Sequence, residues 1–294
     1  MRLLHSFAAV TTVVLATLPV SAQACMSDEQ VAALYASYNA KTPAVNPEGL
    51  TDEAGACSRG KLTALMEKQG MQLVGYKAGL TNPAVQKRFN TDKPVWGKLY
   101  APMMLKDGAQ VDAAFGARPL FEADMLVRVS SEAINSAKTP ADVLAAIDQI
   151  IPFIELPDLV VQAPPRLNGA AISAINVGAR LGVVGQPIAV PFTRAEKFQM
   201  LDALRDMQVT MTDVSSSGGG ANLGGGQGSD ILEHPLNAVV WLAQALAKEG
   251  QSMKVGQLIS LGSFSPLVPT KAGLAVTVTY AGLPGAKPVT VSFK

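Results

Sequence analysis

Residues 115–129 read FGARPLFEADMLVRV, and residues 150–159 read IIPFIELPDL. In the first segment apolar side chains fall on every second position, which is the period of a β-strand with one buried face. Glu122 and Asp124 share the opposite face of that strand. Glu155 ends the apolar run of the second segment. The two segments therefore place three carboxylates in strands that are otherwise apolar.

Carboxylates among apolar strands are costly to desolvate unless an opposite charge compensates them. Oxygen ligands with room for water and substrate suit Mg²⁺ or Mn²⁺, so Glu122, Asp124 and Glu155 are candidate metal ligands. The alternative is that Glu122 and Asp124 face solvent on an edge strand while Glu155 caps a turn, because Glu-x-Asp is a common pattern. The motifs in the rest of the chain favour the metal site.

The composition excludes several classes of protein. The chain has 294 residues, of which 48% are hydrophobic and 16% charged, enough for a substantial core in one or two domains. The formal net charge is +1, and no basic stripe with interleaved aromatic residues is present, which argues against a nucleic-acid partner. No segment after the amino terminus is expected to cross a membrane.

The first 24 residues are typical of a secretory signal peptide. Arg2 supplies a basic start, residues 7–20 are apolar but too short for a good membrane span, and Ala22-Gln23-Ala24 fits a cleavage site. Cleavage there makes Cys25 the first mature residue and predicts a periplasmic or secreted protein. The alternative is a lipoprotein anchored through Cys25.

Export bears on the pairing of the cysteines. Cys25 and Cys57 are the only two in the chain, and an oxidising compartment permits a disulfide between them. In the chain-entropy model such a bond would stabilise the fold by about 3–4 kcal/mol. Two unpaired thiols are the alternative.

Local patterns predict an amino-terminal helical segment, residues 25–70, followed by a β-rich catalytic domain, residues 71–294. The predicted helices are 27–41, 54–69, 81–89 with Thr81 as its cap, one that begins at Thr139 with a capping-box pattern, and 236–248. The predicted strands are 71–78, 96–100, 120–129, 150–155, two within 201–213 and several short ones between 253 and 293.

Two further features bear on function. Lys77 lies among apolar residues of a predicted strand, where it either extends to solvent at an edge or serves as a proton donor or acceptor with a lowered pKa. Residues 215–229 read SSSGGGANLGGGQGS, but no Gly-Lys-Ser/Thr follows, which excludes a phosphate-binding loop. We expect a flexible loop or lid there.

Five motifs in order give the chain a resemblance to a known family. They are VGYKAGLT at 74–81, Glu-x-Asp at 122–124, PFIEL at 152–156, HPLNAVVWLAQAL at 234–246 and GQLISLGSFSPLVP at 256–269. The chain resembles the fumarylacetoacetate hydrolase superfamily from residue 73 onward, and within it the 2-keto-4-pentenoate hydratase and oxalocrotonate decarboxylase branch. The resemblance implies an α+β fold, a mixed β-roll or sandwich with flanking helices, assembled as a homodimer or higher homo-oligomer.

The resemblance also implies roles for individual residues. The metal-binding Glu-x-Glu pair of the family matches Glu122 and Asp124, and its third ligand matches Glu155. Its catalytic Lys matches Lys77. The acidic residue of its V-D-x-P motif falls on Asp92 in the TDKP stretch at 91–94. Its late Gly-Ser pair matches Gly262 and Ser263, the latter as a substrate-binding residue.

One region departs from the family pattern. Hydratases carry a second Lys and an A-D-N-A-S segment after the third metal ligand, whereas this chain has Pro164-Pro165-Arg166 and then SAIN at 173–176. Arg166 would replace the Lys charge, and Asn176 would replace the Asn, as substrate-binding residues. From the residues alone, Asn176 is equally an amide that joins two backbone segments.

The resemblance implies a metal-dependent lyase that hydrates a short 2-oxo or 2-hydroxy-dienoic acid through an enolate. Mg²⁺ or Mn²⁺ would stabilise the developing negative charge, while Lys77 moves the proton with help from Asp92. Decarboxylation and C–C hydrolysis on the same scaffold are alternatives. A non-catalytic periplasmic protein that binds carboxylates is a further alternative from another functional class.

Overall fold

The computed structural model describes residues 25–217 and 219–294, so the predicted signal peptide lies outside the described residues. Within this part of the chain, no helix combines the length and the apolar character needed to span a bilayer. The helices are α1 (Asp28–Ala40), α2 (Asp52–Lys68), α3 (Pro83–Arg88), α4 (Pro140–Ala145), α5 (Gly169–Ala174), α6 (Arg194–Asp206) and α7 (Asn237–Lys248), with short 3-10 turns η1 (Ala101–Met103), η2 (Glu132–Ser136), η3 (Pro164–Arg166), η4 (Asn176–Gly178) and η5 (Gly228–Asp230). The strands are β1 (Leu73–Gly79), β2 (Val95–Tyr100), β3 (Met104–Lys106), β4 (Ala109–Val111), β5 (Leu120–Val129), β6 (Ile147–Leu156), β7 (Leu181–Val184), β8 (Ile188–Ala189), β9 (Gln208–Asp213), β10 (Asn222–Gln227), β11 (Leu258–Ser260), β12 (Val268–Pro269), β13 (Ala275–Ala281) and β14 (Val289–Phe293).

The larger sheet has the two carboxylate-bearing strands at its centre. Its nine strands follow the order β2-β1-β11-β5-β6-β7-β3, with β12 beside β5 and β8 beside β6. β1 and β11 are parallel, whereas β5 is antiparallel to both β11 and β6. Since β5 has a strand on either side, almost all of its side chains are buried, on both faces. The alternative of an edge strand with a solvated face is therefore wrong.

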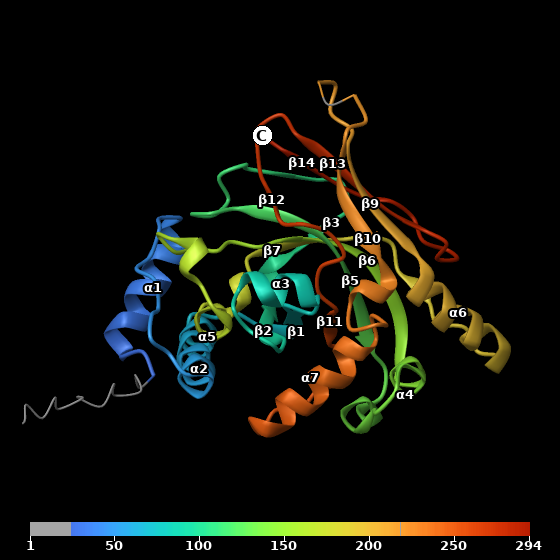
Figure 1. The fold of residues 1–294 in the computed structure, drawn as a ribbon, viewed down its shortest axis with the longest axis horizontal. Coiled ribbons are helices and arrows are strands. Elements are labelled where there is room, and N and C mark those ends of the chain that lie inside the picture. The colour runs from blue at the N-terminus through green and yellow to red at the C-terminus, as the bar shows by residue number, and fades with distance from the viewer. Residues whose placement is uncertain (1–24, 218) are drawn as a thin grey trace, which may run out of the picture.

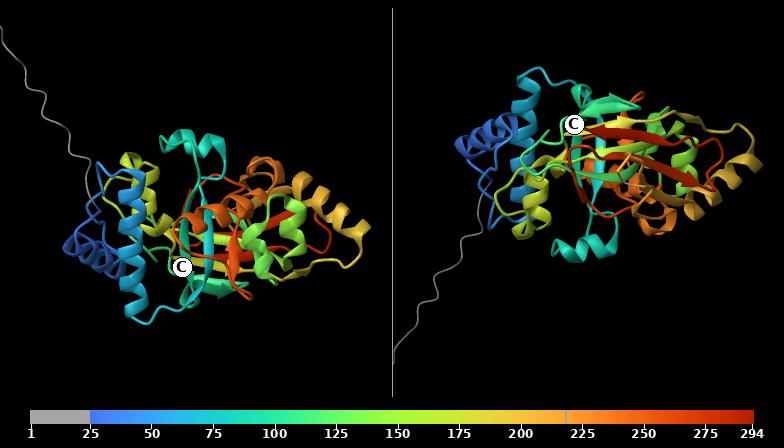
Figure 2. Two further views of the ribbon diagram at one scale, coloured as in Figure 1. Left: turned by 90° about the horizontal axis from the view of Figure 1, so that it is seen from below. Right: turned by 90° about the horizontal axis from the view of Figure 1, so that it is seen from above.

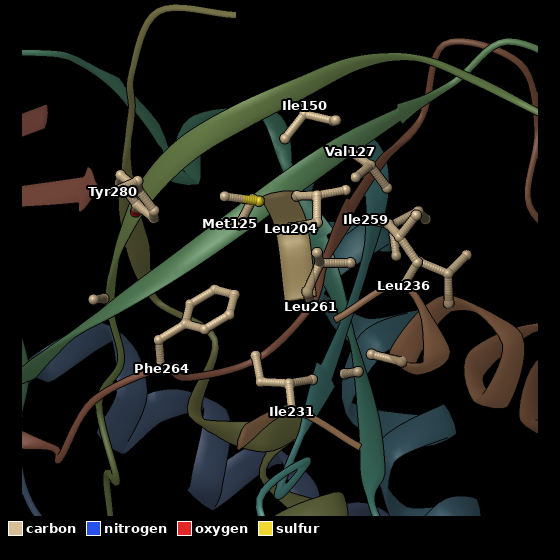
Figure 3. Close-up of a cluster of buried hydrophobic side chains, with 14 of the residues drawn as sticks. Met125, Val127, Ile150, Leu204, Ile231, Leu236, Ile259, Leu261, Phe264 and Tyr280 are labelled. Carbon is tan, nitrogen blue, oxygen red and sulfur yellow. The ribbon is translucent and has the colours of Figure 1, made fainter. Parts of the chain in front are cut away.

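The second sheet has five strands in the order β10-β9-β13-β14-β4. A hydrophobic core joins the two sheets and the nearby helices: Met125, Val127 and Ile150 of the larger sheet belong to one cluster with Leu204 of α6 and Tyr280 of β13 (Figure 3). These mixed sheets with flanking helices confirm the predicted α+β architecture.

The amino-terminal helices form a separate layer. α1, α2 and α5 gather on one side of the sheets, and α6 lies at the opposite end of the molecule (Figures 1 and 2). A second hydrophobic cluster contains Leu34 of α1, Leu62 of α2 and Ile172 of α5. A disulfide joins Cys25 to Cys57 in α2, with the two Cα atoms 5.6 Å apart, as expected for the oxidised protein. The domain boundary after residue 70 stays a prediction.

Helix α3 begins differently from the prediction. Its N-cap is Asn82, whose Oδ1 accepts a hydrogen bond from Ala84 N at 2.8 Å. The prediction that Thr81 caps this helix is therefore wrong. The predicted capping box at Thr139 is confirmed at the start of α4, and Ser27, the first residue of the predicted helix 27–41, caps α1 in the same reciprocal way.

The prediction of two strands within 201–213 is wrong in its first half. α6 extends to Asp206, and only Gln208–Asp213 forms a strand. Thr193 caps the helix by accepting a hydrogen bond from Glu196 N. Met200 and Leu204 are its buried residues, four positions apart on one face. The segment 201–213 alone does not show this helical spacing, because the helix and its apolar face begin before residue 201.

The expectation of a flexible loop or lid at 215–229 is also wrong for its second half. Asn222–Gln227 forms strand β10, antiparallel to β9. Glycine is required because the backbones approach closely: a Cβ on Gly225 would lie 2.1 Å from the Val209 carbonyl oxygen. Repeated glycines here reflect tight packing of a strand, which composition alone does not distinguish from a loop.

Candidate active site

Two neighbouring strands, β5 and β6, bring the predicted acidic residues to one place. Glu122 on β5 is paired in register with Glu155 on β6, so the two residues lie directly opposite each other. Asp124 follows two positions along β5, on the same face as Glu122. Lys77 comes from β1 and reaches Glu155, to whose Oε1 its Nζ donates a hydrogen bond. All four side chains are buried.

Both carboxylate oxygens of Asp124 accept hydrogen bonds. Ser260 Oγ donates to Oδ2 at 2.5 Å, and Gly262 N donates to Oδ1 at 3.0 Å. Met125 N also donates to Oδ1, at 2.5 Å. The turn after β11 makes this possible because Gly262 has a φ of +98°, a conformation that favours glycine. Asp124 is therefore a rigidly held, completely buried carboxyl group.

The 3-10 turn η4 binds the Lys77 ammonium through a backbone carbonyl group. Val177 O accepts a hydrogen bond from Lys77 Nζ at 3.1 Å. Asn176 fixes this turn to β2, because its Oδ1 accepts from Lys98 N at 2.7 Å and its Nδ2 donates to Lys98 O at 3.0 Å. Asn176 and Val177 both have a φ of +54°, so the side-chain clamp holds an unfavourable backbone conformation.

The electrostatics of the cluster call for additional positive charge. Three carboxylates against the one Lys77 ammonium leave a formal charge of −2. Burial, and secondly the negative charge of Glu155, raises the pKa of Asp124 to about 8 and holds the pKa of Glu122 well above its usual range. Glu155 Oε2 is buried with no hydrogen-bond partner in the described part of the chain.

These observations fit a hard divalent cation. The available metal ligands are carboxylate oxygens, and their formal charge exceeds that of Lys77 by two negative charges. One carboxylate oxygen, Glu155 Oε2, has no hydrogen-bond partner in the described residues. In residues 25–217 and 219–294, no three His, Cys, Asp or Glu side chains form a ready cation site. The reason is visible in the contacts: Lys77 occupies one oxygen of Glu155, and Asp124 is turned toward Ser260 and Gly262.

A cavity of about 370 Å³ opens beside this cluster. Lys77 and Glu122 line it, and so do Thr81, Arg88 of α3 and Asp230 of η5. Much of the remaining wall is apolar, with contributions from Leu80, Val85, Phe89, Leu159, Ile172, Val177, Phe264, Pro266 and Leu267. The cavity thus has a charged pole next to an apolar body, which suits a small anionic substrate with a hydrocarbon chain.

The structure brings some predicted site residues together and separates others. Ser263 lines the cavity, although its hydroxyl already donates to Ser265 O at 2.7 Å. Asn176 binds backbone groups of Lys98, as described above, and does not line the cavity.

Asp92 and Arg166 lie elsewhere, which corrects their assignment to the site. Asp92 is exposed and lines a separate surface depression with Asp52 and Lys93, so it does not assist Lys77 in this structure. Arg166 is exposed in η3 and pairs with Glu48 at 2.8 Å. The TDKP and PPR segments follow the family order in sequence, but the loops that carry them turn away from the cavity.

Three cavity residues were not predicted from the sequence. Thr81 was interpreted as a helix cap, Arg88 as an ordinary helix residue, and Asp230 lies beyond the glycine-rich segment. Only Thr81 had a local signal, since it belongs to the GLT end of the Lys77 motif. The positions of Arg88 and Asp230 depend on long-range packing.

Comparison with known proteins places this site in a family. No family model matches the chain. The chain is 32% identical over 216 residues to a 2-hydroxyhexa-2,4-dienoate hydratase of Comamonas testosteroni, a match that covers 71% of this chain and 75% of the relative. It is 31% identical over 215 residues to the TodF product hydratase of Pseudomonas putida, covering 73% of this chain and 75% of the relative.

A solved structure agrees with these relatives. The structure of 4-oxalocrotonate decarboxylase from Pseudomonas putida G7, complexed with magnesium and adipate, superposes with a TM-score of 0.76 at 25% identity, covering 92% of this chain and all of the other. The sequence matches, the shared fold and the carboxylate cluster point to one conclusion: the chain belongs to the 2-keto-4-pentenoate hydratase branch of the fumarylacetoacetate hydrolase superfamily.

Proposed function

We propose that this protein is a divalent-cation-dependent hydratase that adds water to a short 2-hydroxy-dienoic acid or its 2-oxo tautomer. The observation that carries the proposal is the cluster of Glu122, Asp124, Glu155 and Lys77 at one pole of a cavity with apolar walls. The hydratase relatives support the reaction type. Magnesium in the decarboxylase structure supports Mg²⁺ as the cation, with Mn²⁺ as the substitute of similar chemistry.

Each group in the cluster has a distinct task. Glu122, Asp124 and Glu155 would hold the cation, and the bound cation would act as a Lewis acid toward the negative charge that develops on the substrate during tautomerisation. Asp124 would fix the position of the cation, because hydrogen bonds from Ser260 and Gly262 orient both of its carboxylate oxygens. The apolar walls keep bulk water from the conjugated chain of the substrate.

Lys77 is placed to move the proton. Its ammonium is almost fully buried, lines the cavity and is held between Glu155 and the Val177 carbonyl oxygen. A cation on Glu155 would compete with this ion pair and so make the Lys77 proton available for transfer. The predicted partner Asp92 lines a separate surface depression and not this cavity, so we assign the proton transfer to Lys77 alone.

The Glu155→Gln substitution tests the proposal directly. The amide keeps the size of the side chain and an acceptor for Lys77, but it removes a negative charge from the cation site. We expect a folded protein that neither binds Mg²⁺ in calorimetry nor hydrates a 2-hydroxy-dienoate. The matched control is Glu132→Gln, because Glu132 is exposed and its carboxylate pairs with the equally exposed Lys254.

The outcome separates the competing functions. Wild-type hydration that Glu155→Gln abolishes and Glu132→Gln leaves intact supports the hydratase. Full activity in Glu155→Gln refutes the assignment of the site. Mg²⁺-dependent binding of a 2-oxo acid by the wild type without turnover of any dienoate would favour the non-catalytic carboxylate-binding protein.

Decarboxylation is a second candidate because of Arg88. This cationic residue lines the same cavity as Lys77 and Glu122, and it forms no salt bridge within the described residues. It would receive a second carboxylate at the far end of a dicarboxylic substrate, as adipate is the dicarboxylate in the decarboxylase structure. Measuring hydration and CO₂ release with mono- and dicarboxylic substrates distinguishes the two reactions.

Export and assembly complete the proposal. The signal-peptide pattern of residues 1–24 and the Cys25–Cys57 disulfide both support a periplasmic or secreted location. The disulfide disfavours the lipoprotein alternative, because a Cys25 sulfur in a disulfide cannot carry a lipid. A homodimer or higher homo-oligomer is proposed from the family resemblance, and light scattering of the mature protein tests it.

A further inference from the structure

Thr81 lines the cavity and has a buried hydroxyl with no hydrogen-bond partner among the described residues. The residue is 2% exposed. Among the buried side-chain oxygens and nitrogens of the described residues, only Thr81 Oγ1 and Glu155 Oε2 lack a partner. An unpaired buried hydroxyl is destabilising, so its retention needs an explanation. That both unpaired atoms belong to the Lys77–Glu155 region indicates a common ligand.

The backbone around Thr81 is shaped to present this hydroxyl. β1 ends at Gly79, and the next residue, Leu80, has a φ of +55°, which is unfavourable for a residue other than glycine. Gln86 holds the turn, because its Nε2 donates a hydrogen bond to Leu80 O at 2.8 Å. Strained positions of this kind are typical of binding sites, where the surrounding structure holds them in place.

The hydroxyl lies at the charged pole of the cavity. A Cβ on Gly262 would be 2.2 Å from Thr81 Oγ1, so the hydroxyl packs directly against that glycine. The N–H of Gly262 donates to Asp124 Oδ1. Gly262 therefore lies between Thr81 and the proposed cation ligand Asp124. This is the end of the cavity that Lys77 and Glu122 also line.

We propose that Thr81 is a substrate-binding residue whose hydroxyl donates a hydrogen bond to a carboxylate oxygen of the 2-oxo acid. The inference rests on the proposed function and adds a residue to it. The neighbouring donors have partners already: Lys77 Nζ bonds Glu155 and Val177 O, and Gly262 N bonds Asp124. Beside these donors, the Thr81 hydroxyl is buried and unpaired within the described residues, and a carboxylate next to the 2-oxo group is an acceptor that such a substrate supplies.

This role predicts opposite effects on stability and on binding. Thr81→Val replaces the hydroxyl by a methyl group of nearly the same shape. Since the hydroxyl has no partner within the described residues of the free protein, its loss should leave the urea unfolding midpoint unchanged or raise it. The ligand, in contrast, loses a hydrogen bond to a charged group, so its dissociation constant should rise roughly ten- to hundredfold.

The experiment uses calorimetric titration of the mature, Mg²⁺-loaded protein with oxalate, together with urea unfolding of the metal-free protein. Thr81→Ser keeps the hydroxyl and should bind oxalate nearly as the wild type does. Thr63→Val is the matched control: Thr63 is 1% exposed on α2, and its hydroxyl donates to Gly60 O at 3.2 Å. We expect Thr63→Val to lower the unfolding midpoint and to leave oxalate affinity unchanged.

The results separate this inference from the proposed function. Weaker oxalate binding by Thr81→Val, at an unchanged or higher unfolding midpoint, supports the role. An unchanged oxalate affinity overturns it, and so does a loss of stability like that of Thr63→Val or a failure to fold, since each would mean that the hydroxyl has a structural partner. If the wild type binds Mg²⁺ but no oxalate, the proposed function itself fails, and the role of Thr81 with it.

Discussion

Removal of divalent cations should make the stability of this protein fall as the pH rises. Asp124 shows why, because burial and the charge of Glu155 raise its pKa from 3.8 to about 8. Between these two values, folded Asp124 keeps a proton that the unfolded chain has already lost. Unfolding then releases a proton, so a higher pH favours the unfolded state. The stabilisation is present at low pH and is lost as the pH rises from roughly 4 to 8.

The magnitude follows from the size of the pKa shift. A carboxyl group that is protonated in the folded protein and ionised in the unfolded chain lowers the free energy of unfolding by about 1.4 kcal/mol for each unit by which the pH rises. Over the whole interval, Asp124 alone accounts for at most roughly 5–6 kcal/mol. Glu122 acts in the same direction, because burial raises its pKa too. A change of this size is comparable with the total stability of many domains, about 5–15 kcal/mol.

Urea unfolding in EDTA and in excess Mg²⁺, at several values between about pH 5 and pH 8, measures the effect. In EDTA we expect the free energy of unfolding to decrease steadily across this range. In Mg²⁺ the cation binds the deprotonated carboxylates, so the decrease should disappear or reverse. Asp124→Asn removes the titrating group and should flatten the EDTA curve by about 1.4 kcal/mol per pH unit.

Two results would refute the reasoning. One is a metal-free stability that stays constant or rises between about pH 5 and pH 8, where the sign requires a fall. The other is an Asp124→Asn variant whose slope in EDTA equals that of the wild type. Either would mean that the carboxylates are ionised and compensated without a cation.

Three further predictions test other parts of the structure. Lys77→Met should lower the free energy of unfolding of the metal-free protein by roughly 3 kcal/mol, because Glu155 loses its buried partner; an unchanged urea midpoint would contradict this. Replacing Cys25 and Cys57 by Ser should cost about 3–4 kcal/mol, since the disulfide joins residues 32 positions apart; equal melting temperatures for variant and wild type would speak against a structural disulfide. Asn176→Ala should cost about 1–3 kcal/mol through the loss of two partly buried hydrogen bonds and should lower kcat more than it raises KM; a stable variant with normal kinetics would show that the clamp does not position Lys77.

The sequence predicts the charged pole of the site because that information is local. Alternation along one strand is enough to place Glu122 and Asp124 on a common face, and the apolar run before Glu155 indicates a second buried strand. Lys77 stands out for the same reason, as a cation inside an apolar strand. The family resemblance then relates these residues to one another, and the strand register confirms that Glu122 and Glu155 are opposite.

The rest of the site depends on contacts that no local pattern contains. Asp92 and Arg166 follow the family order in sequence, yet their loops carry them to the exposed surface. Asn176 could be read either as a substrate ligand or as a backbone clamp, and only its two bonds to Lys98 decide for the clamp. Strand β10 has a loop-like composition, and its glycines are explained only by the closeness of β9.

By itself, the sequence determined the two carboxylate strands, the place of Lys77 within an apolar strand and the β-rich end of the chain, because the period of a strand and the spacing of its side chains are set within a few residues. Only the tertiary structure decided what surrounds them. Thr81, Arg88 and Asp230 meet in one cavity although up to 149 positions separate them in the sequence. Their meeting depends on how the sheets and helices pack, and whether a buried hydroxyl such as that of Thr81 has a partner is settled only when every neighbouring segment is in place.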